Sequence, residues 1–160
     1  MVATLLALSL TPWAHPLSFH ALPGWRAGAS GNTHSLYSTG PFESAAWTAR
    51  NVRYVDTATA DPPNRTLAHL PAGGLIVWAV IFSPVENGEK PITLDLRQAR
   101  HLKCCDGPVA VAGGDDELTG YGPGRAYSII IRVYFGSRAT TTRITEAQRA
   151  LDQLRLPARM

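Results

Sequence analysis

The stretch AYSIIIRVYFGSR, residues 126–138, decides the fold class of this chain. In an extended strand, successive side chains point to opposite faces. One face is then entirely apolar or aromatic, with Tyr127, Ile129, Ile131, Val133 and Phe135. The other face is mixed, with Ser128, Ile130, Arg132 and Tyr134. The stretch therefore predicts a strand with one dry face and one half-wet face, and the dry face needs a cover.

A helix near the end of the chain is predicted to supply that cover. Thr145 and Gln148 have the spacing of a capping box, and Glu146 suits the positive end of a helix dipole. An apolar stripe with helical spacing follows, formed by Ala147, Ala150, Leu151 and Leu154. A helix of about ten residues is marginal alone in water, so we expect it to lie on the strand at 127–135.

A second strand is predicted from LIVWAVIFS, residues 75–83, which is apolar at every position from Leu75 to Phe82. Both of its faces must be covered, so it is expected to be a central strand. Asn87-Gly88 is a hairpin signal, and ITLDL at 92–96 alternates with Ile92, Leu94 and Leu96 inward. These patterns predict a hairpin between 75–83 and 92–96.

The remaining sequence predicts short strands and helical turns separated by loops. Strands are expected near 17–21, 33–39, 47–55 and 108–112, with helical turns near 42–46 and 66–70. A connector is expected at 97–107 and a long loop at 113–125, in which three consecutive carboxylates (115–117) diverge and form a solvated tip instead of a calcium loop. The predicted fold class is α+β: a twisted antiparallel sheet of about six or seven strands covered by a C-terminal helix.

Composition agrees with one domain, expected over residues 17–160. The chain has 160 residues, 12 prolines and 14 glycines, which favours a turn-rich β architecture. The net charge is +3, and the basic residues are scattered from Arg26 to Arg159. Nucleic-acid binders gather cations on one face, so we predict no nucleic-acid partner.

The first 16 residues are expected to be a signal peptide or its remnant. Val2 to Leu10 form an apolar run of the length of a signal-peptide h-region, although no basic residue precedes it and no clear A-x-A site follows. The alternative is an N-terminal strand or packed arm. The signal-like run leads us to predict a secreted or cell-envelope location. No stretch is long enough to span a bilayer as a helix, so we predict no transmembrane segment.

Metal-capable residues cluster once in the sequence, at His101, Cys104, Cys105 and Asp106. A structural zinc site takes four ligands, usually as two spaced pairs, and adjacent cysteines point apart in an extended chain. The prediction is therefore no metal site and no cofactor, with the cysteines as free thiols, a local ring or a bond to another chain. Metal binding by His101, Cys104 and Cys105 is kept as an alternative.

Catalytic motifs are weak. GASGN around Ser30 is not a nucleophile elbow, GYGPGR at 120–125 is a turn and no phosphate cradle, and the other histidines show no i, i+4 pairing: His15, His20, His34 and His69. We predict no catalytic residue, although a site assembled in space stays open. Three tryptophans could line a ligand groove, and of these Trp78 suits the core better: Trp25, Trp47 and Trp78.

The two ends of the chain resemble a family. LSFHALPGW (17–25) resembles the start of small exported bacterial domains related to PsbP-like and LpqN-like proteins. IIIRVYFGSR (129–138) and AQRALDQLRLP (147–157) resemble their last strand and closing helix, and look closer still to actinobacterial secreted proteins with VYFG and AQ..LD.L. The resemblance implies an antiparallel sheet with helix cover and an envelope or secreted location. It carries no catalytic residue, and the lipobox cysteine of the lipoprotein members is missing.

The function expected from these observations is a non-catalytic extracytoplasmic module that binds a protein or envelope component. The alternatives are a hydrolase-type enzyme with a spatially assembled site, or the metal-binding protein described above. A pocket that joins a histidine, a carboxylate and a serine or cysteine would favour the hydrolase.

Overall fold

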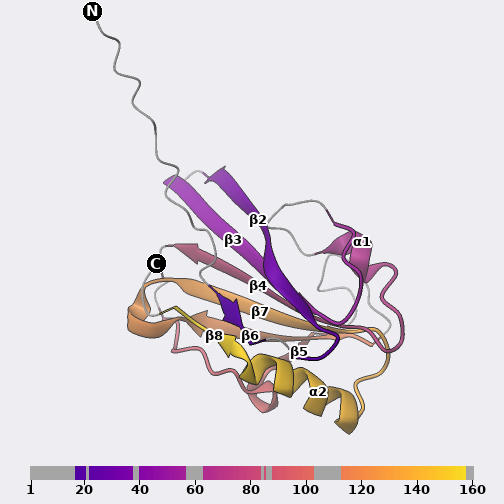
Figure 1. Ribbon diagram of the computed structural model, residues 1–160. Helices are drawn as coiled ribbons and strands as arrows, with labels where there is room; N and C mark the ends of the chain where they lie inside the picture. The colour runs from indigo at the N-terminus through magenta and orange to yellow at the C-terminus, as the bar shows by residue number, and fades with distance from the viewer. Residues whose placement is uncertain are drawn as a thin grey trace, which may run out of the picture.

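The fold is built on one antiparallel sheet of six strands, in the order β2-β3-β4-β7-β6-β5 (Figure 1). The computed structural model describes residues 17–20, 22–37, 40–56, 63–83, 85, 88–102 and 113–157, and within 30–45 and at 83 only the backbone. The strands of this sheet are β2 (Arg26–Tyr37), β3 (Gly40–Arg50), β4 (Leu75–Ser83), β5 (Arg100–Leu102), β6 (Asp115–Tyr121) and β7 (Ser128–Phe135). The predicted α+β class, with an antiparallel sheet and a C-terminal helix, is confirmed.

Smaller elements surround this sheet. A two-stranded sheet joins β1 (Ser18–Phe19) to β8 (Leu154–Arg155), so the two ends of the described chain meet. The helices are α1 (Asn64–Leu67) and α2 (Thr141–Asp152), and two 3-10 turns are η1 (Leu96–Gln98) and η2 (Pro123–Arg125). None of the described helices is long and apolar enough to cross a membrane.

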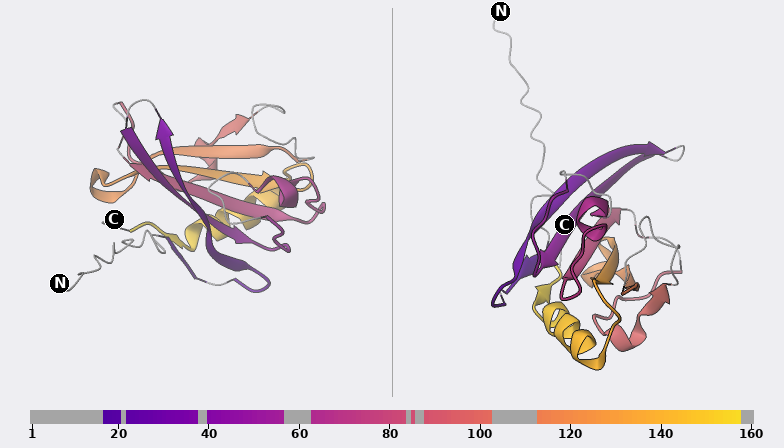
Figure 2. Two further views of the ribbon diagram at one scale, coloured as in Figure 1. Left: turned by 90° about the horizontal axis from the view of Figure 1, so that it is seen from above. Right: turned by 90° about the vertical axis from the view of Figure 1, so that its right-hand side faces the viewer.

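The central pair β4–β7 forms as the alternation predicts, with Ala79 opposite Ile131. One face carries the odd-numbered residues of both strands and packs against Ala147, Ala150 and Leu151 of α2. The opposite face forms a second, smaller apolar cluster, where Leu67 of α1 contributes. Two views from other sides show the sheet between the two helices (Figure 2). The cover expected for the dry face of β7 is therefore α2.

The start of α2 differs from the prediction. The helix begins at Thr141, because the side chain of Thr140 accepts a hydrogen bond from the backbone N–H of Arg143 at 3.4 Å. Gln148 is not a capping residue: its amide bridges the backbone of 94–96, donating to the Leu94 carbonyl at 2.8 Å and accepting from the Leu96 N–H at 2.9 Å. Leu154 is buried as expected, but in β8.

The predicted hairpin between 75–83 and 92–96 is wrong. Both edges of β4 are occupied, by β3 and by β7, so no edge is left for 92–96. Pro91 instead forms a parallel bridge with Tyr121, and Leu96 opens the 3-10 turn η1. Ile92 and Leu94 still pack against the α2-side core, so their inward orientation is correct although their partner is not.

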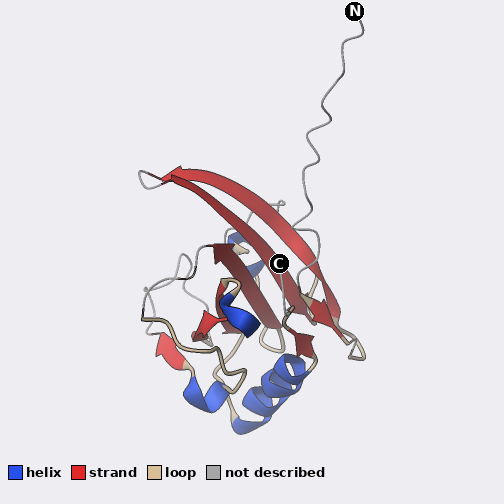
Figure 3. Ribbon diagram, turned by 90° about the vertical axis from the view of Figure 1, so that its left-hand side faces the viewer, coloured by secondary structure: helices blue, strands red, loops and turns tan. Residues whose placement is uncertain are grey.

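Two further predictions in the first and last thirds of the chain need correction. The helical turn near 42–46 is wrong, because these residues belong to β3, which pairs with β2 and β4. The loop at 113–125 is wrong over most of its length, because 115–121 form β6, an inner strand between β7 and β5. The connector at 97–107 includes β5, and the strand expected at 108–112 lies outside the described residues. Figure 3 shows the resulting balance of strands and helices.

One tyrosine ties the end of the described chain to the core. The hydroxyl of Tyr127 donates to the carbonyl oxygen of Pro157 at 3.0 Å, and its ring is fully buried. Burial raises the pKa of Tyr127 to about 12. Tyr127, in the stretch that decides the fold, therefore also fixes the segment after β8.

Replacing Gly136 with alanine is expected to lower the free energy of unfolding by about 1–3 kcal/mol. A Cβ at this position would lie 1.8 Å from the backbone oxygen of Pro71, so the two segments would have to separate. The matched control is Gly73→Ala, because a Cβ there meets no atom within 4 Å. Urea denaturation of both variants checks the prediction, and equal stabilities for the two would contradict it.

Candidate functional site

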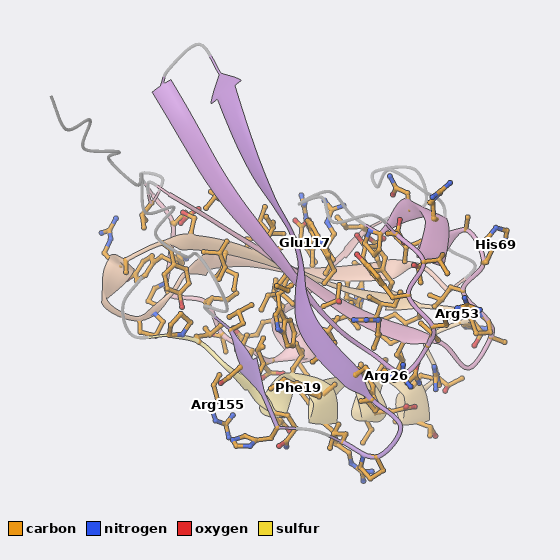
Figure 4. All side chains as sticks on the ribbon, turned by 45° about the horizontal axis from the view of Figure 1, so that its top comes forward. Phe19, Arg26, Arg53, His69, Glu117 and Arg155 are labelled. Carbon is orange, nitrogen blue, oxygen red and sulfur yellow. The ribbon has the colours of Figure 1, made fainter. Side chains whose placement is uncertain are left out.

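Charged side chains converge on one row across β5, β6 and β7. The register places Arg100 opposite Glu117, and Glu117 opposite Arg132. Arg100 Nη2 donates to Glu117 Oε1 at 2.6 Å, and Arg132 Nε donates to Glu117 Oε2 at 2.7 Å. Both oxygens of the carboxylate are thus engaged by guanidinium groups. Leu118 belongs to the α2-side core, so its neighbour Glu117 faces the other side of the sheet (Figure 4).

Two of the three side chains in this row are largely shielded from water. The side chain of Glu117 is 5% exposed and that of Arg132 is 17% exposed, whereas Arg100 is 71% exposed. Burial opposes the charge on Arg132, but its hydrogen bond to Glu117 and the nearby negative charge outweigh burial, so the pKa of Arg132 lies above its ordinary value. Burial also raises the pKa of Tyr134 on the same face. Arg100 is the member of the row that reaches solvent.

Sequence reasoning placed these carboxylates on a solvated loop tip, which is wrong. Asp116 and Glu117 are both buried; Glu117 is paired with arginines, and Asp116 contacts the imidazole of His101. The signal that could have found the pairing is Arg132, a cation in the middle of an apolar strand. A buried cation needs a carboxylate partner, and the DDE run ends 15 positions before Arg132 along the chain.

A histidine–carboxylate pair lies next to this row. His101 Nδ1 lies 2.5 Å from Asp116 Oδ1. Asp116 precedes Glu117 and therefore faces the α2 side of the sheet. The imidazole of His101 is 79% exposed. Within the described parts of the chain, no hydroxyl or thiol hydrogen-bonds to His101, so the geometry joins two members of a triad and not three.

A polar pocket of about 420 Å³ opens beside β6, and we call it the edge pocket. Its walls combine cations, hydroxyls and the buried carboxylate: Lys90, Pro91, Thr93, Gln98, Arg100, Glu117, Leu118 and Thr119. It lies between the segment that bridges to Tyr121 and the short strand β5. Its volume is within the range of small-ligand sites.

The backbone of β6 is open inside the edge pocket. Tyr121 donates its N–H to the Lys90 carbonyl at 2.9 Å and accepts from the Ile92 N–H at 3.0 Å, so its polar groups point away from β7. In an antiparallel ladder this direction repeats every second residue, so the N–H and C=O of Thr119 point the same way. Pairing with β5 ends at Glu117. Among the residues that the structure describes, no hydrogen bond satisfies these two groups of Thr119.

Two other pockets are less suited to a ligand. One of about 530 Å³ lies between η1 and α2, but four of its polar residues are engaged with one another: Arg97 with Asp95 at 2.7 Å, and Gln148 with Asp152 at 2.8 Å. The other, of about 450 Å³, lies along α1 near Arg65 and His69. Neither presents an open strand edge.

The other sequence candidates do not assemble into a site within the described residues. Cys104, Cys105 and Asp106 lie outside those residues, as does His15, and of Ser30 and His34 only the backbone is described. No group of three metal-capable side chains occurs in the described part of the chain. The tryptophans lie in or against the core: Trp47 and Trp78 are buried on opposite faces, and Trp25 packs against Phe19.

The fold and the site define an α+β protein with a six-stranded antiparallel sheet and a cation-rimmed pocket at the edge of β6. Comparison with protein-family models, with curated proteins and with solved structures found no match. What the chain does is therefore argued from its own geometry.

Proposed function

We propose that this chain is a non-catalytic extracytoplasmic binding module whose edge pocket holds an anionic group of its ligand. The observation that carries the proposal is the pairing of Glu117. Both of its oxygens are engaged by arginines, and Lys90 stands at the rim as a further cation. Two arginines thus pair with one carboxylate, and with Lys90 in the same pocket lining the group of four side chains carries a net positive charge.

The solvent-facing part of this charge is available to a ligand. Arg100 uses one nitrogen on Glu117, and its guanidinium has further donors in a planar fork that matches a carboxylate or a phosphate. Lys90 is exposed and lines the same pocket. An anion between them would be bound by charge and by directed hydrogen bonds, while Glu117 holds Arg100 in place.

Binding is favoured over hydrolysis by the same contacts. A general base must reach the proton that it removes, and the oxygens of Glu117 are both engaged by arginines. The hydrolase alternative would use the His101–Asp116 pair, which lies on the other face of β6 from Glu117. The metal alternative depends on Cys104 and Cys105, and elemental analysis of the purified protein tests it directly.

The extracytoplasmic location is proposed on two features of the sequence. The apolar run at 2–10 has the length of a signal-peptide core, and the ends of the chain resemble exported PsbP-like and LpqN-like proteins. An extracytoplasmic binding module would meet anionic groups on peptides and envelope components. The basic side chains of the edge pocket would contact the anionic group of either.

Titration with acetate, at constant ionic strength, is expected to shift the backbone amide signals of residues 90, 100 and 119 with saturation below about 50 mM. Lys90→Gln should weaken this binding about threefold to fivefold, because one exposed charge contributes up to about 1 kcal/mol. Arg149→Gln is the matched control, because Arg149 is an exposed cation on α2. Shifts that never saturate, or equal weakening in both variants, would show that no anion site exists here.

A further inference from the structure

We propose that the edge pocket captures the carboxyl-terminal end of an extended peptide. This inference rests on the proposed function and names the ligand class of the same site. The carboxylate would lie between Lys90 and Arg100, and the last peptide units would hydrogen-bond to the backbone of Thr119.

The backbone of β6 is open at Thr119. An N–H and a C=O that point outward from one strand residue are the groups to which another extended chain adds. Thr119 presents both groups toward the edge pocket. On its other side, β6 is held in the sheet by pairing with β7 along its whole length. A ligand with an amide group therefore finds one preformed rung of a ladder.

The opening along β6 is short. Toward one end of β6, Arg100 already pairs with Glu117, and toward the other end Pro91 bridges to Tyr121. The interval from Glu117 to Tyr121 spans about 13 Å of strand. A strand that continued in both directions would collide with these two segments. Only the end of a chain fits between them.

The charge in the edge pocket distinguishes the two ends of a peptide. A chain end carries either an ammonium or a carboxylate group, and the exposed charged side chains in the pocket lining are Lys90 and Arg100. An ammonium group would meet two cations, whereas a carboxylate would form charge-assisted hydrogen bonds with them. The pocket is therefore matched to the carboxyl end.

The test compares N-acetyl-trialanine, which has a free carboxylate, with its carboxamide by NMR titration of the ¹⁵N-labelled protein. The acid is expected to bind about tenfold more tightly than the amide, and also more tightly than acetate, with the largest shift at the Thr119 amide. Intermolecular NOEs between the peptide and residues 118–120 should accompany the shift. Equal affinities for acid and amide, or acid affinity no greater than that of acetate, would overturn the inference.

Two substitutions at one position separate the backbone contact from the side chain. Thr119→Pro removes an N–H that takes part in no bond to β7, so the sheet should persist while peptide binding weakens about fivefold or more. Thr119→Val keeps the N–H and should bind like the wild-type protein. Unchanged peptide binding in Thr119→Pro would contradict the proposed rung. The titrations of the wild-type protein decide the matter if that variant does not fold.

The outcomes also separate this inference from the proposed function. If acetate binds with saturation and the peptide acid gains nothing over it, the anion site stands and the peptide ligand is wrong. If neither acetate nor the peptide acid binds, the proposed function itself is wrong.

Discussion

Replacing Arg132 with methionine is expected to lower the free energy of unfolding by about 3 kcal/mol. Glu117 would keep only Arg100 as a partner, and Arg100 is mostly exposed to water. A carboxylate that is 5% exposed would thus lose its buried counter-charge. Removal of one partner of a buried pair costs more than the pair itself contributes, because the remaining charge stays desolvated.

The double variant Glu117→Leu/Arg132→Leu supplies the decisive contrast. Replacing both partners with apolar residues leaves no uncompensated charge, so its stability should come within about 1 kcal/mol of the wild-type protein or exceed it. The control Arg97→Met removes an exposed cation from a surface pair and should leave stability unchanged. Urea denaturation of the three variants measures these differences. An Arg132→Met variant as stable as the control would contradict the buried pairing.

Leu151→Ala is expected to cost about 2–5 kcal/mol, the usual range for a large buried side chain truncated to alanine. Leu151 is fully buried in the cluster that joins α2 to β4 and β7. Alanine has the higher helix propensity, so a loss of stability would report packing and not helix formation. Urea denaturation measures the change.

The matched control for this variant lies on the same helix. Arg149→Ala makes the same propensity change on the exposed side of α2, and it should alter the free energy of unfolding by less than about 0.5 kcal/mol. If Leu151→Ala were as mild as this control, α2 would not be the cover of the sheet.

The edge pocket could not be read from the sequence, although its parts are visible there. Lys90 and Arg100 stand ten positions apart, and both lie far along the chain from Arg132. Only the strand order β7-β6-β5, together with the bridge at Pro91, brings them around Glu117. Strand order depends on which edges are still free when partners meet, and local alternation does not encode it.

The failed hairpin shows the same limit. Asn87-Gly88 and the alternation in 92–96 are good local signals, and Ile92 and Leu94 do point into the core. The strands β3 and β7 occupy both edges of β4, so the local preference had no partner to satisfy it. The prediction for residues 115–117 was wrong in the opposite sense. Their charges indicated an exposed loop, whereas all three residues pair with β7 inside the sheet.

The sequence by itself determined which faces of the central strands and of the last helix are apolar. The continuous apolar run at 75–82, the period-two alternation at 127–135 and the apolar stripe of the last helix specify which side chains leave water. Burial of apolar surface drives folding whatever the topology. Tertiary structure alone decided the neighbours: which strand pairs with which, where a buried arginine finds its carboxylate, and where one rung of β6 is left open. Those choices depend on contacts between residues distant along the chain, and no local pattern records them.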